Sequence, residues 1–168
     1  MFLNGLPVLS GIDTLIFNRN YEPVGKQNID SLLKALDTFL RDYNKAGFQI
    51  TSIRCDEQFI PLMQPLMDEY NIELIPVVPG DHAAHVERHI RTSKERIRTV
   101  VHGLPFQYFP KLLLLKIGQR QTLTLNLFPP KGGVSGDYSP YSIMTGKTPT
   151  YDDVNIPFKH VDVNKEPT

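Results

Sequence analysis

The chain has 168 residues, of which 40% are hydrophobic, so it suits one folded domain with one sizeable core. Its longest purely apolar run, 112–115, is far shorter than the roughly 20 residues that span a bilayer, so we expect no membrane partner. The net charge is zero, which by itself argues against a nucleic-acid partner.

The chain opens with three short apolar runs, 1–4, 6–12 and 14–17, which are typical of a small antiparallel meander. The first residues carry no basic group, and Asn4 and Gly5 interrupt their apolar character. We therefore expect no secretory signal there.

Helical periodicity begins at residue 28. Over 28–45, apolar residues recur at steps of three and four, which predicts an amphipathic helix that ends at Gly47. A strand, a helix and a second strand are expected next. The first strand covers 48–55 and ends at Asp56, the helix covers 59–70, and the second strand covers 72–78.

The remaining elements are predicted to be helices, at 83–101, 111–127 and 139–144. Ser139 can cap the last of these, with Pro140 at its first position. This order predicts an α/β fold with a mixed sheet, in which an antiparallel meander joins parallel strands and helices flank them. We expect one domain over 1–146 and an irregular C-terminal extension over 147–168.

Charge is unevenly distributed along the chain. Residues 1–87 hold 6 Lys+Arg against 12 Asp+Glu, whereas residues 88–136 hold 9 against 1. Such separation favours an acidic pocket beside a basic surface, as a metal-dependent enzyme acting on phosphodiesters requires. The alternative is that these charged residues lie on ordinary solvent-exposed helix faces, which explains the same numbers of acidic and basic residues.

Two carboxylates occupy positions that can meet. Asp56 follows a predicted strand, and Glu87 lies in the first turns of a predicted helix, with one helix and one strand between them. Carboxylates brought together repel one another unless a hard cation lies between them, and Mg²⁺ or Mn²⁺ is the natural occupant. The plainer alternative is that Asp56 and Glu87 are exposed to solvent and belong to no site.

The predicted helix over 83–101 also carries a row of cations. At about 100° per residue, Glu87, Arg91, Lys94 and Arg98 fall within a stripe roughly 60° wide. A neighbouring apolar stripe would pack on the sheet. The spacing therefore indicates that a nucleic-acid backbone binds along the cations, with its reacting phosphate at Glu87. An exposed helix with incidental charge pairs has the same pattern.

Histidine and cysteine allow two further interpretations. His82, His85 and His89 are spaced for zinc, but no cysteine completes a ligand set. Cys55 stands beside Asp56, which suggests a catalytic nucleophile, yet a cysteine at a strand end is usually a small buried hydrophobe. As the single cysteine it excludes an internal disulfide and fits a reducing, intracellular compartment.

Four segments, in order, resemble the integrase catalytic core of copia-type long-terminal-repeat retrotransposons. Residues 47–59, GFQITSIRCDEQF, are similar to the strand that carries the second catalytic aspartate. Residues 87–96, ERHIRTSKER, are similar to the helix that carries the catalytic glutamate. Residues 126–131, NLFPPK, are similar to the later helix junction of the family, and residues 139–146, SPYSIMTG, are similar to its closing segment.

The resemblance implies an RNase H-like fold, two divalent ions (Mg²⁺ or Mn²⁺) and DNA strand transfer. It assigns catalysis and metal ligation to Asp56 and Glu87, and contact with the DNA end to Arg91 and Lys94. It also implies a homo-oligomer that acts on element ends and target DNA, in the nucleus when the target is host DNA.

The chain departs from the family pattern at its start. The first catalytic aspartate of the family precedes the segment that residues 1–5 resemble, so the resemblance implies an N-terminally truncated core. Asp13 is a poor substitute by position, and 79–85 lacks the Asn-Gly of many relatives. Because two carboxylates bind metal weakly, we expect little or no strand transfer from this chain alone.

The sequence therefore predicts a fragment of a retrotransposon integrase core. A catalytically dead nucleic-acid-binding remnant, which uses the basic residues of 88–136 without chemistry, is the first alternative. An RNase H-like nuclease acting on RNA–DNA hybrids is the second.

Overall fold

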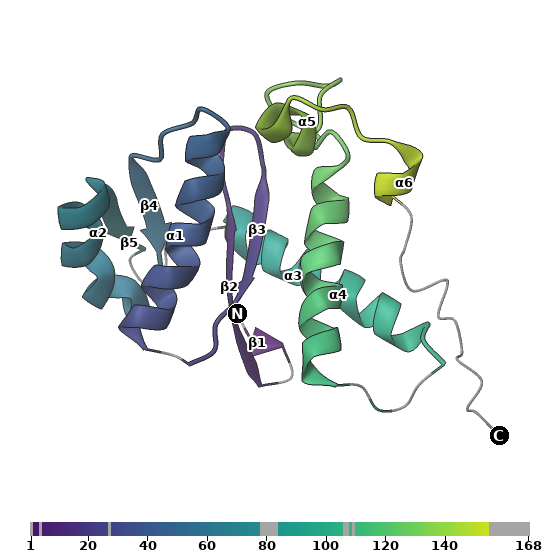
Figure 1. The fold of residues 1–168 in the computed structure, drawn as a ribbon, viewed down its shortest axis with the longest axis horizontal. Helices are drawn as coiled ribbons and strands as arrows, with labels where there is room; N and C mark the ends of the chain where they lie inside the picture. Colours follow the sequence, from purple (N-terminus) through teal and green to yellow (C-terminus); the bar gives the residue numbers. More distant parts are fainter. Residues whose placement is uncertain are drawn as a thin grey trace, which may run out of the picture.

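The structure, a computed structural model, describes residues 2–3, 5–26, 28–77, 84–105, 108 and 110–154 (Figure 1). The elements are β1 (Phe2–Leu3), β2 (Leu6–Ile12), β3 (Arg19–Pro23), α1 (Ile29–Lys45), β4 (Ser52–Cys55), the 3₁₀ helix η1 (Glu57–Leu62), α2 (Met63–Tyr70), β5 (Glu73–Pro76), α3 (Ala84–His102), α4 (Lys111–Asn126), α5 (Pro140–Thr145) and α6 (Tyr151–Val154). None of the described helices is long and apolar enough to cross a membrane.

The first three strands form an antiparallel sheet in the order β1-β2-β3, in which Val8 pairs with Pro23 and Ile12 with Arg19. The predicted third strand at 14–17 was wrong. The carboxylate of Asp13 accepts hydrogen bonds from the amides of Leu15, Ile16 and Asn18, at 3.0, 2.7 and 2.9 Å. These bonds hold the segment as a tight loop, so the strand begins only at Arg19.

The second sheet consists of β4 and β5, which pair in parallel from Ser52 with Glu73 to Cys55 with Pro76. β4 is shorter than the predicted strand because the amide of Phe48 donates to the Tyr43 carbonyl at 2.9 Å and so closes the end of α1. The mixed α/β class, with antiparallel and parallel strands, is confirmed. Among the described residues, however, the strands form two sheets and not the single mixed sheet that we expected.

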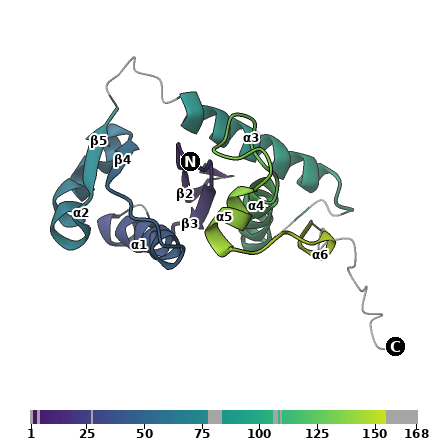
Figure 2. The same ribbon diagram turned by 90° about the horizontal axis from the view of Figure 1, so that it is seen from above.

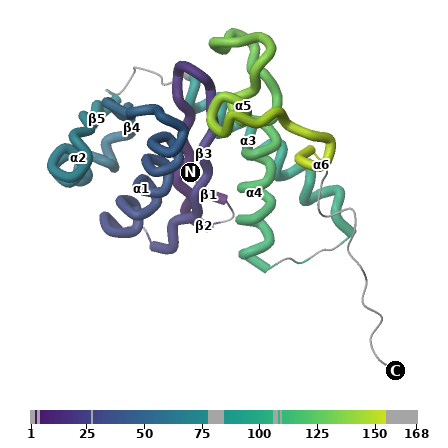
Figure 3. The backbone as a smooth tube through the Cα atoms, turned by 45° about the horizontal axis from the view of Figure 1, so that its top comes forward, coloured from purple at the N-terminus to yellow at the C-terminus, as the bar shows by residue number. Residues whose placement is uncertain are grey.

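The β2–β3 hairpin lies between two helical layers, with α1 on one side and α3 and α4 on the other (Figure 3). Val8 and Leu9 are successive residues of β2, so their side chains point to opposite faces. Leu9 joins a core with Leu36 of α1 and Leu66 of α2, whereas Val8 belongs to a second core with Ile97 and Ile117. The hairpin is therefore buried on both faces and connects the two halves of the molecule.

A glycine permits the close approach of α4 to β3. A Cβ atom at Gly118 would overlap the ring and hydroxyl of Tyr21, so only glycine lets α4 pack there. Tyr21 is 5% exposed, and burial raises its pKa to about 12. Packing at this contact offsets the usual cost of glycine inside a helix.

The helix predictions are largely confirmed. Asn28 caps α1 by accepting the Ser31 amide at 3.0 Å, and Gly47 follows the helix with φ +82. Ser139 caps α5 in the same way, accepting the Ser142 amide at 3.1 Å.

Two helical segments differ from the prediction. The helix expected over 59–70 divides into η1 and α2, with Pro61 inside η1. The extension that we expected to be irregular contains α6, whose start is closed by the carboxylate of Asp153 accepting the Thr150 amide at 2.8 Å. Residues 155–168 lie outside the described part.

Candidate nucleic-acid interface

One face of α3 is locked into the core. His89, Ser93 and Ile97 are 3%, 1% and 1% exposed. The Nε2 atom of His89 lies 2.9 Å from the Ser10 hydroxyl of β2, and its Nδ1 atom lies 3.4 Å from the Ser93 hydroxyl. Burial, and then the charge of Arg19, lower the pKa of His89 to about 4, so its ring is neutral at pH 7.

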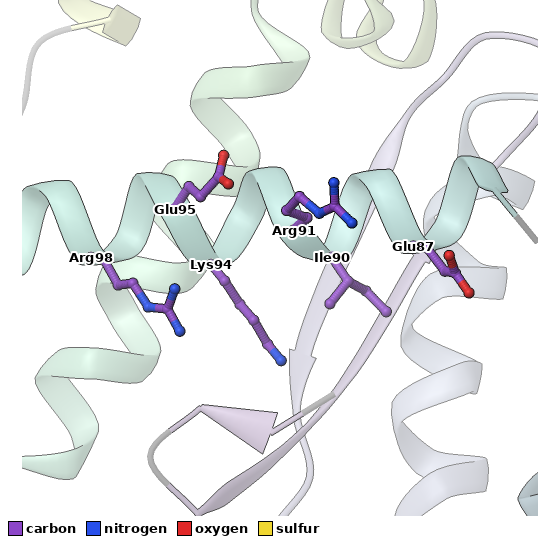
Figure 4. A pocket seen from close by; sticks show the side chains of 6 residues that line it. All are labelled: Glu87, Ile90, Arg91, Lys94, Glu95 and Arg98. Atoms are coloured by element: carbon purple, nitrogen blue, oxygen red, sulfur yellow. The ribbon is translucent and has the colours of Figure 1, made fainter.

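The other face of α3 is open to solvent. Six residues line a shallow hollow of about 350 Å³ along it, namely Glu87, Ile90, Arg91, Lys94, Glu95 and Arg98 (Figure 4). Lys94 and Arg98 point to the same side of the helix as Glu87, whereas Arg91 leans to the side of Glu95 (Figure 4). Three residues of the predicted stripe, Glu87, Lys94 and Arg98, therefore share one side of α3, while Arg91 lines the same hollow from the other side (Figure 4).

Asp56 lies at the carboxyl edge of the parallel sheet. It follows β4 directly and is exposed, and its side chain makes no capping hydrogen bond to η1. Because β4 and β5 are parallel, Val77 leaves β5 at this same edge, where its amide donates to the Cys55 carbonyl at 2.8 Å. The chain continues from there to α3, and in Figure 2 the end of β5 and the first turn of α3 lie on the same side of the molecule.

The described residues do not complete a metal site. No three His, Cys, Asp or Glu side chains of residues 2–77 and 84–154, in their described parts, gather where they would hold an ion. Asp81 and His82 belong to 78–83, outside the described residues. Asp56 and Glu87 are both exposed, and as two carboxylates they fall short of the ligand set that a pair of divalent ions needs.

Asp13 does not supply a third ligand, because its carboxylate is already fully engaged. Besides three amides of its own loop, it accepts the Tyr43 hydroxyl at 2.8 Å. Burial, followed by the charge of Asp13, raises the pKa of Tyr43 well above its usual value, so the hydroxyl keeps its proton. This acid holds the hairpin loop against α1.

The zinc alternative gains no support from His85 and His89, the two of its three candidate histidines that the structure describes. Both ring nitrogens of His89 face serine hydroxyls, and the ring of His85 packs against Phe17 with centroids 5.9 Å apart. Cys55 packs against the core beside α1 and α2, and burial, then the charge of Asp56, raise its pKa to about 11. It is a thiol at pH 7, as expected for a structural cysteine.

Two cations are engaged in contacts that the sequence did not reveal. Arg120 of α4 donates to the backbone carbonyl of Asp153 and so fixes α6. Arg19, from the acidic first half of the chain, begins β3 and lies beside α3 and α4. Only long-range packing brings it to the basic half, so neither motif nor periodicity identified it.

No protein-family model matches the chain, and no curated protein matches it.

Proposed function

We propose that the chain is part of an integrase-like core, with an RNase H-like arrangement, whose exposed α3 face binds the DNA backbone. The observation that carries this proposal is the division of α3 into two faces. One face is held against β2 through His89, and the opposite face presents Arg91, Lys94 and Arg98 around a shallow hollow.

The spacing of these cations suits a polyanion. Arg91 and Arg98 are separated by about 10 Å along the helix axis, since each residue rises about 1.5 Å. A single DNA strand carries a phosphate every 3.4 Å or so along the duplex axis, so about three phosphates span that length. Contacts of this kind orient the backbone and carry no sequence information.

The same proposal assigns Asp56 and Glu87 as carboxylates of a Mg²⁺ or Mn²⁺ site. A bound divalent ion supplies activation of an attacking oxygen and stabilisation of the leaving one. With only these two carboxylates, metal binding is weak, and the chain alone carries little or no strand-transfer activity.

A non-catalytic nucleic-acid-binding protein is the second candidate. Two observations favour it. α3 presents a cationic face. Among the described residues, no three His, Cys, Asp or Glu side chains gather into a metal-binding group. This candidate needs the α3 face but neither Asp56 nor Glu87.

Duplex DNA binding in Mg²⁺ and in EDTA, for the wild type and for Glu87→Gln, distinguishes the candidates. The integrase proposal expects Mg²⁺ to strengthen binding and Glu87→Gln to remove that gain. Binding that ignores Mg²⁺ and survives Glu87→Gln would leave the non-catalytic function. Failure of the wild type to bind DNA at low salt would end both.

A further inference from the structure

The two sheets lie over the same helix, with β2 and β4 as their neighbouring strands. Leu9 of β2 and Leu74 of β5 belong to one core, together with Leu36 of α1. In Figure 1 and Figure 2, β4 lies between β5 and the β2–β3 hairpin, and in Figure 1 β2 is the hairpin strand on that side. The edge of β4 that faces away from β5 is therefore turned toward the edge of β2 that faces away from β3.

The backbone of β2 is only partly paired on that edge. The Asp13 amide donates to the Asn18 carbonyl at 3.2 Å and continues the β2–β3 ladder, so the odd-numbered residues of β2 hydrogen-bond to β3. The backbone groups of Ser10 and Ile12 consequently point to the other edge. There β1 pairs only with residues 6 and 7, and none of the described residues pairs with the backbone of Ser10 or Ile12.

The facing edge of β4 is open in the same way. The carbonyls of Thr51 and Cys55 accept amides at the two ends of β5, at 3.0 and 2.8 Å. Ser52 and Arg54 alternate with these residues, so their backbone groups point away from β5, and both residues are exposed. Among the described strands, β4 pairs with β5 alone.

An apolar hollow of about 240 Å³ lies between β2 and the 3₁₀ helix that follows β4. It is lined by residues 7–9 of β2, by Val24, by Leu32 of α1, and by Gln58 and Phe59 of η1. All of these side chains except that of Gln58 are apolar. Filling the hollow with an apolar side chain would remove this surface from water, which is favourable.

From the two open edges and the hollow beside them, we infer that the slot between residues 10–12 of β2 and 52–54 of β4 binds an extended peptide strand. Successive backbone groups of a strand point to opposite sides, so one peptide can hydrogen-bond to both edges and join the two sheets. Pairing of this kind removes two exposed strand edges at once.

The surroundings of the slot specify an alternating peptide. Side chains directly opposite Leu9 point to the core side, where the hollow lies, and are therefore apolar. The next side chain along lies on the face where Ser10 contacts His89 and is therefore polar. This interaction surface goes beyond the proposed DNA binding and needs none of the α3 cations.

The first test is fluorescence anisotropy of a labelled peptide, Val-Thr-Val-Thr-Val-Thr with blocked ends, titrated with the whole chain. Two control peptides carry N-methyl groups on all the valines or on all the threonines, so each keeps the side chains and loses the donors to one edge. We expect the parent to bind and each control to bind about tenfold more weakly or worse. No binding of the parent, or equal binding by either control, would overturn the inference.

The second test changes the slot itself. Gln58→Trp fills the hollow and should weaken peptide binding about tenfold, whereas Gln64→Trp, an exposed change on α2, should leave it unchanged. Arg54→Pro removes an edge amide that β5 does not use, and Arg54→Ala keeps it, so only the proline variant should lose affinity. If Arg54→Pro fails to fold, Gln58→Trp decides, and binding equal to that of Gln64→Trp would contradict the inference.

The third test is amide hydrogen exchange read by NMR. The amides of Ser10, Ile12 and Arg54 should exchange quickly in the free chain and slowly with the peptide bound, while that of Leu9, which faces β3, should change little. Slow exchange of the three amides without peptide would show that the edges are already covered. Protection that grows with the concentration of the chain alone would make a second copy the occupant, and either result would overturn the peptide site.

Discussion

The hydroxyl of Ser10 on β2 lies 2.9 Å from Nε2 of His89 on α3, and this hydrogen bond joins residues 79 positions apart in the chain. It fixes which way α3 rotates about its own axis. Because His89 faces the hairpin, residues 87, 91, 94 and 98 face solvent. The orientation of the candidate interface thus follows from this hydrogen bond together with the packing of Ile97 in the second core.

Stability should fall in acid because of His89. Its folded-state pKa is about 4 against an ordinary 6.5, so the unfolded chain takes up the proton first as the pH falls. The stability that neutral His89 contributes is fully present above about pH 6.5 and decreases by roughly 3 kcal/mol in total down to about pH 4. Urea unfolding across this range measures the effect.

His89→Gln removes this titration, so its stability should change much less between pH 7 and pH 4. His102→Gln, an exposed change on the same helix, is the matched control and should keep the full slope. Equal slopes for His89→Gln and the wild type would show that another group causes the acid sensitivity.

Gly118→Ala should destabilise the protein, although alanine is the better helix former. The added Cβ overlaps Tyr21, so β3 and α4 must separate, at a cost of about 1–3 kcal/mol. Gly136→Ala meets no atom within 4 Å and is the control. Guanidinium unfolding compares the two, and a Gly118→Ala protein at least as stable as the wild type would contradict the packing described.

Asp13→Asn tests whether Asp13 is structural. It removes one of the two oxygens that hold the loop amides and the Tyr43 hydroxyl, so we expect a loss of about 1–3 kcal/mol in unfolding free energy. Asp30→Asn, an exposed change at the start of α1, serves as control. Mn²⁺ affinity should be the same in Asp13→Asn and the wild type; a lower affinity in Asp13→Asn would make Asp13 a ligand after all.

These predictions show where the sequence was informative and where it was not. Local signals were reliable: Ser139 caps its helix as expected, α1 begins next to residue 28 and ends before Gly47, and the position of the α3 cations follows from helical periodicity. Thr14 to Phe17 has the composition of a strand, yet the side chain of Asp13 captures the loop amides, a competition that apolar patterning does not register.

The long-range contacts of the fold could not be predicted from the sequence. The pairing of Arg19 with Asn126 spans 107 residues, and nothing in either neighbourhood marks it. The division of the strands into two sheets likewise depends on which edges meet in space. Asp56 and Glu87 could be selected by residue type and spacing, but whether a cation joins them depends on packing that spacing does not fix.

Divalent metal should bind weakly and through both acids. We expect Mn²⁺ titration to show a weak site in the wild type that Asp56→Asn and Glu87→Gln each remove, because a remaining single carboxylate is a poor ligand set. Asp68→Asn, exposed on α2, should bind as the wild type does. A cleavage and joining assay should give no turnover above Glu87→Gln, and clear turnover would contradict the expected inactivity of this chain alone.

The salt dependence of DNA binding is the most direct test of the α3 interface. Replacing Arg91, Lys94 and Arg98 by alanine should weaken binding to any duplex sequence and reduce the slope of log affinity against log salt by up to about 3, since each lost phosphate contact contributes about 0.9. Replacing Lys34, Arg41 and Lys45 of α1 by alanine removes the same charge elsewhere and should leave the slope nearly unchanged. Equal slopes for the two triple variants would contradict a DNA-binding role for the α3 face.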